Sequence, residues 1–225
     1  MVDGGSVISF TPAISAQHRV DVVHSFLLAQ LAADRKFGRH TQPLDWYAVH
    51  AHTLEIVGWV VEAHQGFTPY RPNAASFTAV RPVLETLGAI CDAGEQESVA
   101  AAWDILSRLG ERDRSAALFE KESHLGTAGN FQIVAAGEAE GDAVAKLGRF
   151  HFTTGVEVHR LLLTEFSGGT EFLCGSGILR LDNDVYGPLR DSVAAKLGRR
   201  VEDGIVPLPG APLPGTPPLP PGPGG

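Results

Sequence analysis

A short polar segment in the middle of the chain gathers three side chains of the types used in acid–base chemistry. Glu122, Ser123 and His124 are consecutive, and the turn-forming run from Leu125 to Asn130 follows them. A carboxylate and an imidazole can act as general acid or base, and an activated hydroxyl can act as a nucleophile. Adjacent positions do not by themselves pair a nucleophile with its base, so the alternative is a solvated connection. These residues are the catalytic candidates.

A cysteine beside glycines is the second candidate. Cys174 lies in the run from Phe172 to Gly177, where two glycines permit another group to approach the strand closely. A thiol in this position could carry an acyl chain, which makes Cys174 the candidate for lipid attachment. No neighbouring charge in the sequence predicts a lowered pKa for this thiol. The alternative is therefore a small buried hydrophobic side chain.

Two pairs among the nine histidines are candidates for metal binding, because imidazoles commonly bind metals. His50 and His52 fall within a helical pattern, where positions i and i+2 point about 200° apart. We expect one of them to be buried and hydrogen-bonded and the other to lie at the rim. His151 and His159 lie on segments with strand periodicity and are expected to fill core or surface positions. No metal site and no cofactor is predicted.

Signatures of the common enzyme classes are missing from the sequence. It contains no P-loop, no dinucleotide-binding glycine motif after a strand, no H-E-x-x-H, no C-x-x-C and no G-x-S-x-G. This deficit favours a non-enzymatic protein. An atypical hydrolase or transferase that uses Glu122 and His124 is an alternative, because catalytic groups can meet in space from scattered positions.

Composition and charge exclude several partners. The formal net charge of −8 would repel a phosphate backbone, and the basic residues are dispersed, so nucleic-acid binding is not expected. No window approaches the ~20 apolar residues that span a bilayer. The first residues lack a basic region followed by an apolar one. We expect a cytoplasmic protein, or one exported without a classical signal peptide, and two isolated cysteines fit a reducing compartment.

The first half of the chain has helical periodicity after an N-terminal arm at residues 1–15. Apolar residues recur at three- and four-residue spacings. Helices are predicted from Ala16 to Lys36, Leu44 to Ala63, near Thr78 or Arg81 onward, Glu95 to Leu109, and Asp113 to Glu120. Gly66 to Asn73 contains two prolines and is expected to be a turn-rich connection. The apolar residues of the second helix cover most of its circumference, so it is expected to be enclosed.

From Asn130 the hydrophobic period changes to two, which is typical of strands. Four strands with tight turns are predicted, from Asn130, from Lys146 to Thr154, from Val158 to Ser167 and from Thr170 to Leu181. A last helix should run from Val185 to Leu197. The predicted fold class is α+β, with an N-terminal helical layer packed on a four-stranded antiparallel β-meander, a C-terminal helix and a disordered Pro-rich tail.

These elements are expected to form one domain at residues 16–203, with the helical half at 16–122 and the sheet and last helix at 130–198. Residues 204–225 form the Pro/Gly-rich tail. The run from Val206 onward carries no ionisable side chain and cannot build a core, so it should be an extended polyproline segment.

Several segments resemble a family of small leaderless microbial α+β proteins to which no reaction is assigned. The similar stretches cover most of residues 17–200: Trp46-Tyr47, Ile56 with Gly58, Trp59 and Val60, Phe119-Glu120 with Ser123-His124, Gly129 to Ile133, Lys146 to Gly148 with Phe150 and Phe152, and Leu181 to Tyr186 leading into Leu197-Gly198. The resemblance implies a single domain and favours an interaction or effector role. It implies no site residues.

The sequence leads to one main hypothesis and two alternatives. The main one is a non-enzymatic interaction or effector-type protein, whose unknown protein partner binds the domain surface or the Pro-rich tail. The first alternative is a membrane-acting or lipid-associated microbial virulence-type factor acylated at Cys174, although the acidic charge disfavours attraction to anionic lipid. The second is the atypical hydrolase or transferase described above.

Overall fold

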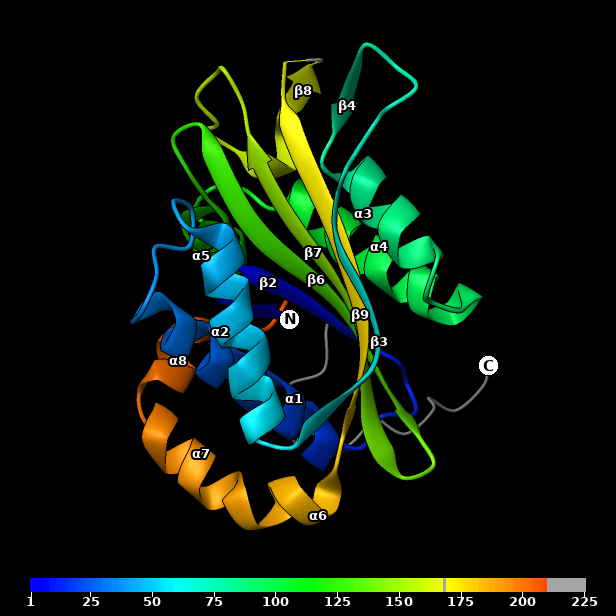
Figure 1. Cartoon of the computed structure of the whole chain (residues 1–225), viewed down its shortest axis with the longest axis vertical. Helices are drawn as coiled ribbons and strands as arrows, with labels where there is room; N and C mark the ends of the chain where they lie inside the picture. Colours follow the sequence, from blue (N-terminus) through cyan, green and yellow to red (C-terminus); the bar gives the residue numbers. More distant parts are fainter. Residues whose placement is uncertain (168, 210–225) are drawn as a thin grey trace, which may run out of the picture.

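The fold is built on a mixed sheet with helices on both faces (Figure 1). The computed structural model describes residues 1–167 and 169–209. In this part of the chain, eight strands join in the order β10-β1-β2-β6-β7-β9-β3, with β5 (His124–Leu125) paired to β6. The α+β class is confirmed. The four-stranded antiparallel meander is wrong, because strands from the first half of the chain extend the sheet on both sides.

The centre of the sheet comes from the second half, where strands were predicted. β6 (Ala128–Ala139), β7 (Asp142–Thr153) and β9 (Glu171–Leu181) are antiparallel neighbours. Their side chains alternate between two cores. Phe131, Ile133, Phe150, Phe152 and Phe172 enter one core, and Val134, Ala145, Leu147, Leu179 and Leu181 enter the other. The strands predicted here from a hydrophobic period of two are therefore confirmed, and both faces of the sheet are buried in a hydrophobic core.

The N-terminal residues are strands and not an arm. β1 (Val2–Asp3) and β2 (Ser6–Phe10) are buried, and β2 runs parallel to β6 from Ser6 opposite Gln132 to Phe10 opposite Ala136. β2 is only five residues long, and its partner lies more than a hundred residues later in the chain. Local periodicity carries no signal for such a distant parallel pairing.

On one face of the sheet, α1 (Ala16–Asp34) packs beside α2 (Pro43–Ile56), as Figure 1 shows. The Ser15 side chain caps α1 by accepting a hydrogen bond from the His18 backbone at 3.1 Å. The prediction of a helix from Leu44 to Ala63 is wrong in its second half. Gly58 has a φ of +100°, ends the helix and directs the chain into β3 (Trp59–Pro69), which pairs with β9. Residues predicted as a turn-rich connection thus also belong to β3.

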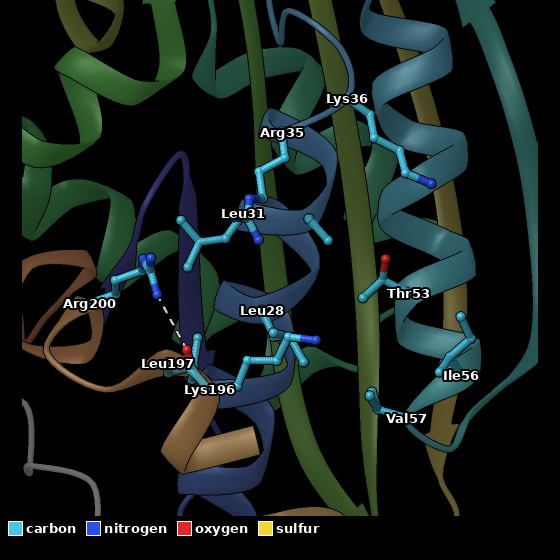
Figure 2. A pocket seen from close by; sticks show the side chains of 11 residues that line it. Leu28, Leu31, Arg35, Lys36, Thr53, Ile56, Val57, Lys196, Leu197 and Arg200 are labelled. Carbon is cyan, nitrogen blue, oxygen red and sulfur yellow. Dashed lines mark hydrogen bonds between the residues drawn. The ribbon is translucent and has the colours of Figure 1, made fainter. Parts of the chain in front are cut away.

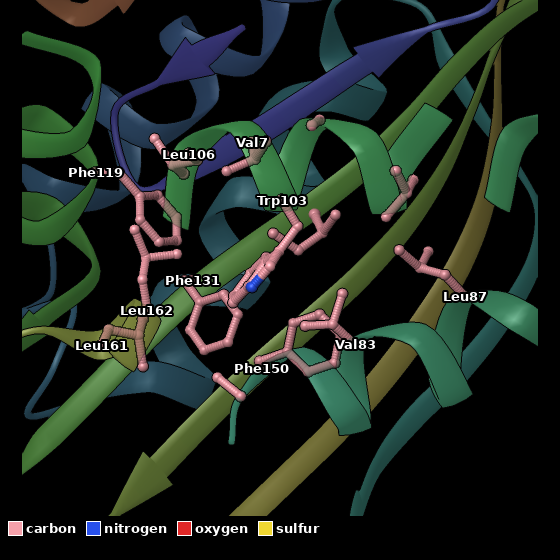
Figure 3. Packing of buried hydrophobic residues seen from close by; sticks show 14 of the residues in the cluster. Val7, Val83, Leu87, Trp103, Leu106, Phe119, Phe131, Phe150, Leu161 and Leu162 are labelled. Carbon is pink, nitrogen blue, oxygen red and sulfur yellow. The ribbon is translucent and has the colours of Figure 1, made fainter. Parts of the chain in front are cut away.

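The opposite face carries α3 (Val80–Gly88), α4 (Ala93–Arg108) and α5 (Arg114–Ser123), close to the predicted helices. Asp92 and Glu95 form a capping box at the start of α4, and Asp113 caps α5. Figure 3 shows how the aromatic side chains of these helices meet those of the sheet: Trp103, Phe119, Phe131 and Phe150. Gly129 is needed in β6, because a Cβ there would lie 2.1 Å from the Phe152 ring.

The predicted strand from Val158 to Ser167 is mostly wrong. The segment holds a 3-10 helix at Leu161–Leu163 and the short β8 (Glu165–Ser167), which pairs with β4 (Ser76–Thr78) in a separate two-stranded sheet. Three consecutive leucines fit neither strand nor helix periodicity well. Here the backbone of the first leucines is held by Glu120, which is far away in sequence.

The C-terminal part returns to the face of α1. α6 (Asn183–Tyr186), a 3-10 turn at Gly187–Leu189 and α7 (Arg190–Leu197) occupy the predicted last helix, and α8 (Arg200–Gly204) follows. β10 (Ile205–Val206) then pairs with β1, so the first residues of the predicted tail belong to the sheet. The rest of the predicted tail, residues 210–225, lies outside the described residues. Within the described ranges, none of the helices has the length and apolar character needed to cross a membrane.

Candidate functional site

The catalytic candidates lie at the end of α5, but they do not form a catalytic arrangement. The Ser123 side chain is buried, and its Oγ donates to the Glu120 carbonyl at 3.5 Å. The Glu122 carboxylate lies 3.0 Å from the ammonium of Lys121. The His124 Nε2 lies 3.1 Å from the carboxylate of Glu120 and not from that of Glu122. Among the described hydrogen bonds, none joins Ser123 to His124, so the geometry offers no activated hydroxyl.

Glu120 is the carboxylate that sequence reasoning missed in this segment. It accepts hydrogen bonds from the backbone N–H of Leu161 at 2.7 Å and of Leu162 at 3.4 Å, and Arg160 Nε lies 3.9 Å away. Its position four residues before His124 is the helical spacing at which two side chains meet, which could have identified the pair. The contacts show a carboxylate that fixes the leucine turn against α5.

Cys174 lies in β9 on the face covered by α3 and is 8% exposed. Burial raises the pKa of its thiol to about 11. A thiol with a raised pKa is protonated at neutral pH and is a poor nucleophile. The acylation of Cys174 therefore stays a prediction, and neither the burial nor the raised pKa of the thiol supports it. Cys91 is similarly buried, and burial raises its pKa to about 12.

Neither histidine pair converges on one point. As predicted, His50 is buried and His52 is exposed, but the hydrogen bond expected for the buried ring is missing at Nε2, which has no partner among the described atoms. His50 stacks on Trp46 with ring centres 5.2 Å apart, and burial, with the nearby Arg39 and Arg149 guanidinium groups, lowers its pKa to about 3. His151 is hydrogen-bonded to the Gly129 carbonyl at 2.8 Å, whereas His159 is exposed. The described residues contain no cluster of three or more potential metal ligands.

An apolar groove lies between α1, α2 and the α7–α8 segment. Its volume is about 560 Å³. Figure 2 shows side chains entering it from three directions: Leu28 and Leu31 from α1, Ile56 and Val57 from the end of α2, and Leu197 from α7. We call this hollow the α1–α2–α7 groove.

The groove exists because α1 carries apolar residues on two faces. Val22, Phe26 and Ala29 pack against the sheet at helical spacing. Leu28, Leu31 and Ala32 point away from the sheet and are only partly covered. A helix that is apolar all round normally has a partner on both faces. In this structure α2 and α7 flank the outer face of α1 without closing over it, and Ile56 remains 62% exposed.

Four cationic side chains surround this apolar floor. Arg35 and Lys36 follow the end of α1, and Lys196 and Arg200 stand on the opposite side. All four are exposed, and none of the described residues that line the groove is an Asp or Glu. Among the described salt bridges, none includes any of them. In a chain with a net charge of −8, this gathering of unpaired cations creates a local positive potential.

The groove therefore combines apolar walls with positive charge at its rim, and the described lining offers no general base or nucleophile. The Thr53 hydroxyl donates to the Val49 carbonyl at 2.8 Å inside α2. Such a lining can bind a ligand that has an apolar body and an anionic end. Sequence reasoning did not find this site. The adjacent Arg35-Lys36 at the end of a helix with a second apolar face was the available signal.

Comparisons with known proteins add little to what the geometry of the groove indicates. No protein-family model matches the chain, and no curated protein sequence matches it. Among solved structures, the chain is similar to one described as "Structure of the Evf virulence factor", with 10% sequence identity and a TM-score of 0.37. The similarity covers 85% of this chain and 77% of that chain. At these values the likeness is a loose one in the arrangement of elements and carries no function over to this chain.

Proposed function

We propose that the protein is a non-enzymatic binding protein whose α1–α2–α7 groove takes a single-chain amphiphile with an anionic head group, such as a fatty acid. The observation that carries the proposal is the pairing of an apolar floor with four cations that have no acidic partner within residues 1–167 and 169–209. The proposal keeps the non-enzymatic role of the main hypothesis, but it replaces the protein partner expected there with a lipid-like ligand, which belongs to the first alternative. Lipid association enters through a groove and not through Cys174.

The alkyl chain of the ligand would lie along the apolar floor. A volume of about 560 Å³ falls within the range of small-molecule sites. Leu28, Leu31 and Ile56 present aliphatic surface that is now open to water. Covering it with an alkyl chain would contribute ~0.8 kcal/mol per buried CH₂ group. The affinity should therefore rise with chain length until the groove is filled.

The head group would lie at the rim, where charge decides which amphiphiles bind. Arg35, Lys36, Lys196 and Arg200 favour a carboxylate or phosphate and repel a cationic head group. Each exposed charge contributes ~0.2–1 kcal/mol and is screened by salt. The alkyl chain should therefore supply most of the affinity, and the rim should supply the selectivity for anions.

A head-group series at constant chain length tests the proposal. Delipidated full-length protein is titrated calorimetrically with dodecanoate, dodecanol and dodecyltrimethylammonium, each below its micelle concentration. We expect affinity in the order anion, neutral, cation, and a weaker dodecanoate signal at high salt. Equal binding of all three would mean non-specific apolar adsorption and would overturn the proposal, as would no binding of dodecanoate.

An acidic amphipathic helix of a partner protein is the other occupant that this lining could accept. The groove is only a few side chains long on α1, from Leu28 to Arg35, which spans about 10 Å of helix. This length fits an alkyl chain better than the anchor residues of a docked helix. Tight binding of an acidic amphipathic peptide, together with no binding of dodecanoate, would replace the present proposal.

A further inference from the structure

A second site lies under α2, where β7 places a charged side chain inside the protein. Arg149 is 8% exposed, and it lies on the face of the sheet that α1 and α2 cover. In the described part of the chain no carboxylate comes within 4.0 Å of its guanidinium. Glu55 also lines this region but is exposed and lies 3.8 Å from His52. A buried charge without a counter-ion is normally strongly unfavourable.

The hydrogen bonds that Arg149 makes leave part of its guanidinium unused. Nη2 is bonded to Nδ1 of His64 at 2.9 Å and donates to the carbonyls of Gln65 at 3.0 Å and Ser176 at 3.2 Å. The buried Nε has no partner among the described atoms. His50 and Arg149 both line a small cavity under α2, and the buried Nε2 of His50 has no partner among the described atoms either. Each of these two cavity-lining residues therefore has a buried nitrogen without a hydrogen-bond partner.

The strands around Arg149 are shaped to hold it. The pairing of β3 with β9 shifts register twice, between Val61 and Ala63 and between Gln65 and Thr68. Such irregularities re-aim backbone groups near binding sites, and here the Gln65 carbonyl is turned to Arg149. The residue directly opposite Arg149 on β9 is Gly175, which has no side chain to occupy the space. The guanidinium also lies 5.5 Å from the centre of the Phe67 ring.

A cavity of about 40 Å³ adjoins these groups. This space is enough for a few water-sized atoms, since a cavity of roughly 10–15 Å³ holds one water. Most of its remaining wall is apolar and includes Leu54, Trp59, Leu147 and Leu179, while Tyr47, Glu55 and His64 also line it. The site therefore offers unpaired donors at one side and aliphatic and aromatic surface at the other.

We propose that this cavity binds a short-chain carboxylate of the size of acetate, whose oxygens accept hydrogen bonds from Arg149 and from His50. A guanidinium edge matches the planar carboxylate geometrically, and charge-assisted bonds of this kind are the stronger ones. The apolar walls accept the short alkyl group, and the small volume excludes longer chains. This site is separate from the α1–α2–α7 groove and does not depend on the function proposed for it.

Binding of ¹³C-labelled acetate to the full-length protein, dialysed into a carboxylate- and halide-free buffer, tests the proposal. We expect a saturable acetate signal, a rise in melting temperature with acetate concentration, and a shifted Nε–H resonance of Arg149. The Arg149→Met variant should lose acetate affinity by about tenfold or more. The control Arg180→Met, on the half-buried and acid-paired arginine of β9, should bind acetate as the parent does.

Three other results would overturn the proposal. Chloride that stabilises the protein as well as acetate does would show a general anion site. No acetate response in the parent protein, with an unchanged Nε–H resonance, would show a cavity that holds water only. If Arg149→Met lowers the melting temperature by the same amount with and without acetate, the Arg149 guanidinium only holds the β3 backbone and does not bind acetate. If Arg149→Met does not fold, the Nε–H resonance of the parent still decides between binding and no binding.

The two binding proposals fail independently. Dodecanoate should not compete with acetate, because its chain is too long for the cavity under α2. Loss of dodecanoate binding in a groove variant should leave the acetate response unchanged. Acetate that is displaced by dodecanoate would contradict the separate location of this second site.

Discussion

Arg200 donates a hydrogen bond through Nη1 to the backbone carbonyl of Lys196 at 3.3 Å, so two cationic side chains stand together on one side of the α1–α2–α7 groove (Figure 2). The bond is to a carbonyl and does not neutralise either charge. On the other side, Arg35 and Lys36 are likewise without an acidic partner in the described structure. The groove is therefore an electropositive region on the surface of an acidic protein.

Removing charge from the rim should weaken anion binding without unfolding the protein. We expect the double variant Lys196→Gln/Arg200→Gln to bind dodecanoate roughly three- to tenfold more weakly, because each exposed charge contributes a fraction of a kcal/mol to about 1 kcal/mol. Its affinity for dodecanol should not change. Titration calorimetry measures both affinities.

The matched control for the rim is the double variant Arg71→Gln/Arg112→Gln, which removes two exposed cations elsewhere on the surface. It has the same change of net charge and should bind dodecanoate as the parent does. If both double variants lose the same affinity, the effect comes from the net charge of the chain and not from the rim of the groove.

An apolar contact at the groove should affect ligand binding more than folding. The Ile56 side chain is 62% exposed, so Ile56→Ser should change the free energy of unfolding by no more than about 0.5 kcal/mol. The same change should reduce dodecanoate affinity by about 1–2 kcal/mol, because the side chain becomes covered only when the ligand binds. Urea unfolding and titration calorimetry give the two numbers. A large stability loss with unchanged affinity would contradict the groove as the binding site.

Glu120 should be important for stability, whereas its neighbour Glu122 should not. Glu120 holds two backbone N–H groups of the leucine turn and the imidazole of His124. Glu120→Ala leaves these buried donors without an acceptor, and we expect a loss of about 2–4 kcal/mol in the free energy of unfolding. The control Glu122→Ala removes a carboxylate whose only described ion pair is with exposed Lys121, and should cost no more than about 0.5 kcal/mol. Urea unfolding of both variants would refute this account if they proved equally stable.

His50 should make the protein less stable in acid. Its folded-state pKa of about 3 lies below the ordinary value of 6.5, so the unfolded chain binds the extra proton between these two pH values. Stability is therefore retained above about pH 6.5 and falls as the pH drops toward 3, by about 2 kcal/mol from this residue at about pH 5. We expect His50→Phe to lose correspondingly less stability than the parent between pH 7 and pH 5. The free energy of unfolding of both proteins is measured with urea at pH 7 and at pH 5. Other buried groups titrate in both proteins, so the effect of His50 is the difference between their stability losses. Equal losses would contradict the lowered pKa of His50.

The sequence predicted the elements whose partners are close in the chain. α4 and α5 have capping carboxylates at their starts and clear apolar faces, and the hairpin of β6 and β7 has a strict period of two. In these segments local chemistry and the final fold agree, so the pattern alone identifies the element.

The missed elements depend on distant contacts. β2 is a strand because β6 pairs with it, and the chain after Gly58 is a strand because β9 supplies its hydrogen bonds. The apolar run from Ile56 to Val61 fits a helix as well as a strand, and only the left-handed conformation of Gly58 separates the two. A glycine at that position was the one local signal available.

The candidate sites were missed for a related reason. Ser123 and His124 are adjacent in sequence, but their side chains make different contacts, and His124 instead meets Glu120 one helical turn earlier. Arg35 and Arg200 are far apart in sequence and are brought to one groove only by the packing of α7 and α8 against α1. Function in this protein is therefore better inferred from side chains that converge in space than from those that stand together in the chain.

Isotope-filtered NOE spectroscopy of ¹³C-labelled dodecanoate bound to unlabelled full-length protein tests the central claim most directly. We predict NOEs from the ligand methylene groups to the methyl groups of Leu28, Leu31 and Ile56, with the carboxylate end near Lys196 and Arg200. In the Ile56→Ser variant the NOEs to Ile56 should be lost, and those to Leu28 and Leu31 should weaken because the ligand binds less tightly. Ligand NOEs to the aromatic cluster around Phe131 and Phe150 instead, or no intermolecular NOEs at saturating dodecanoate, would contradict the claim that the α1–α2–α7 groove is the binding site.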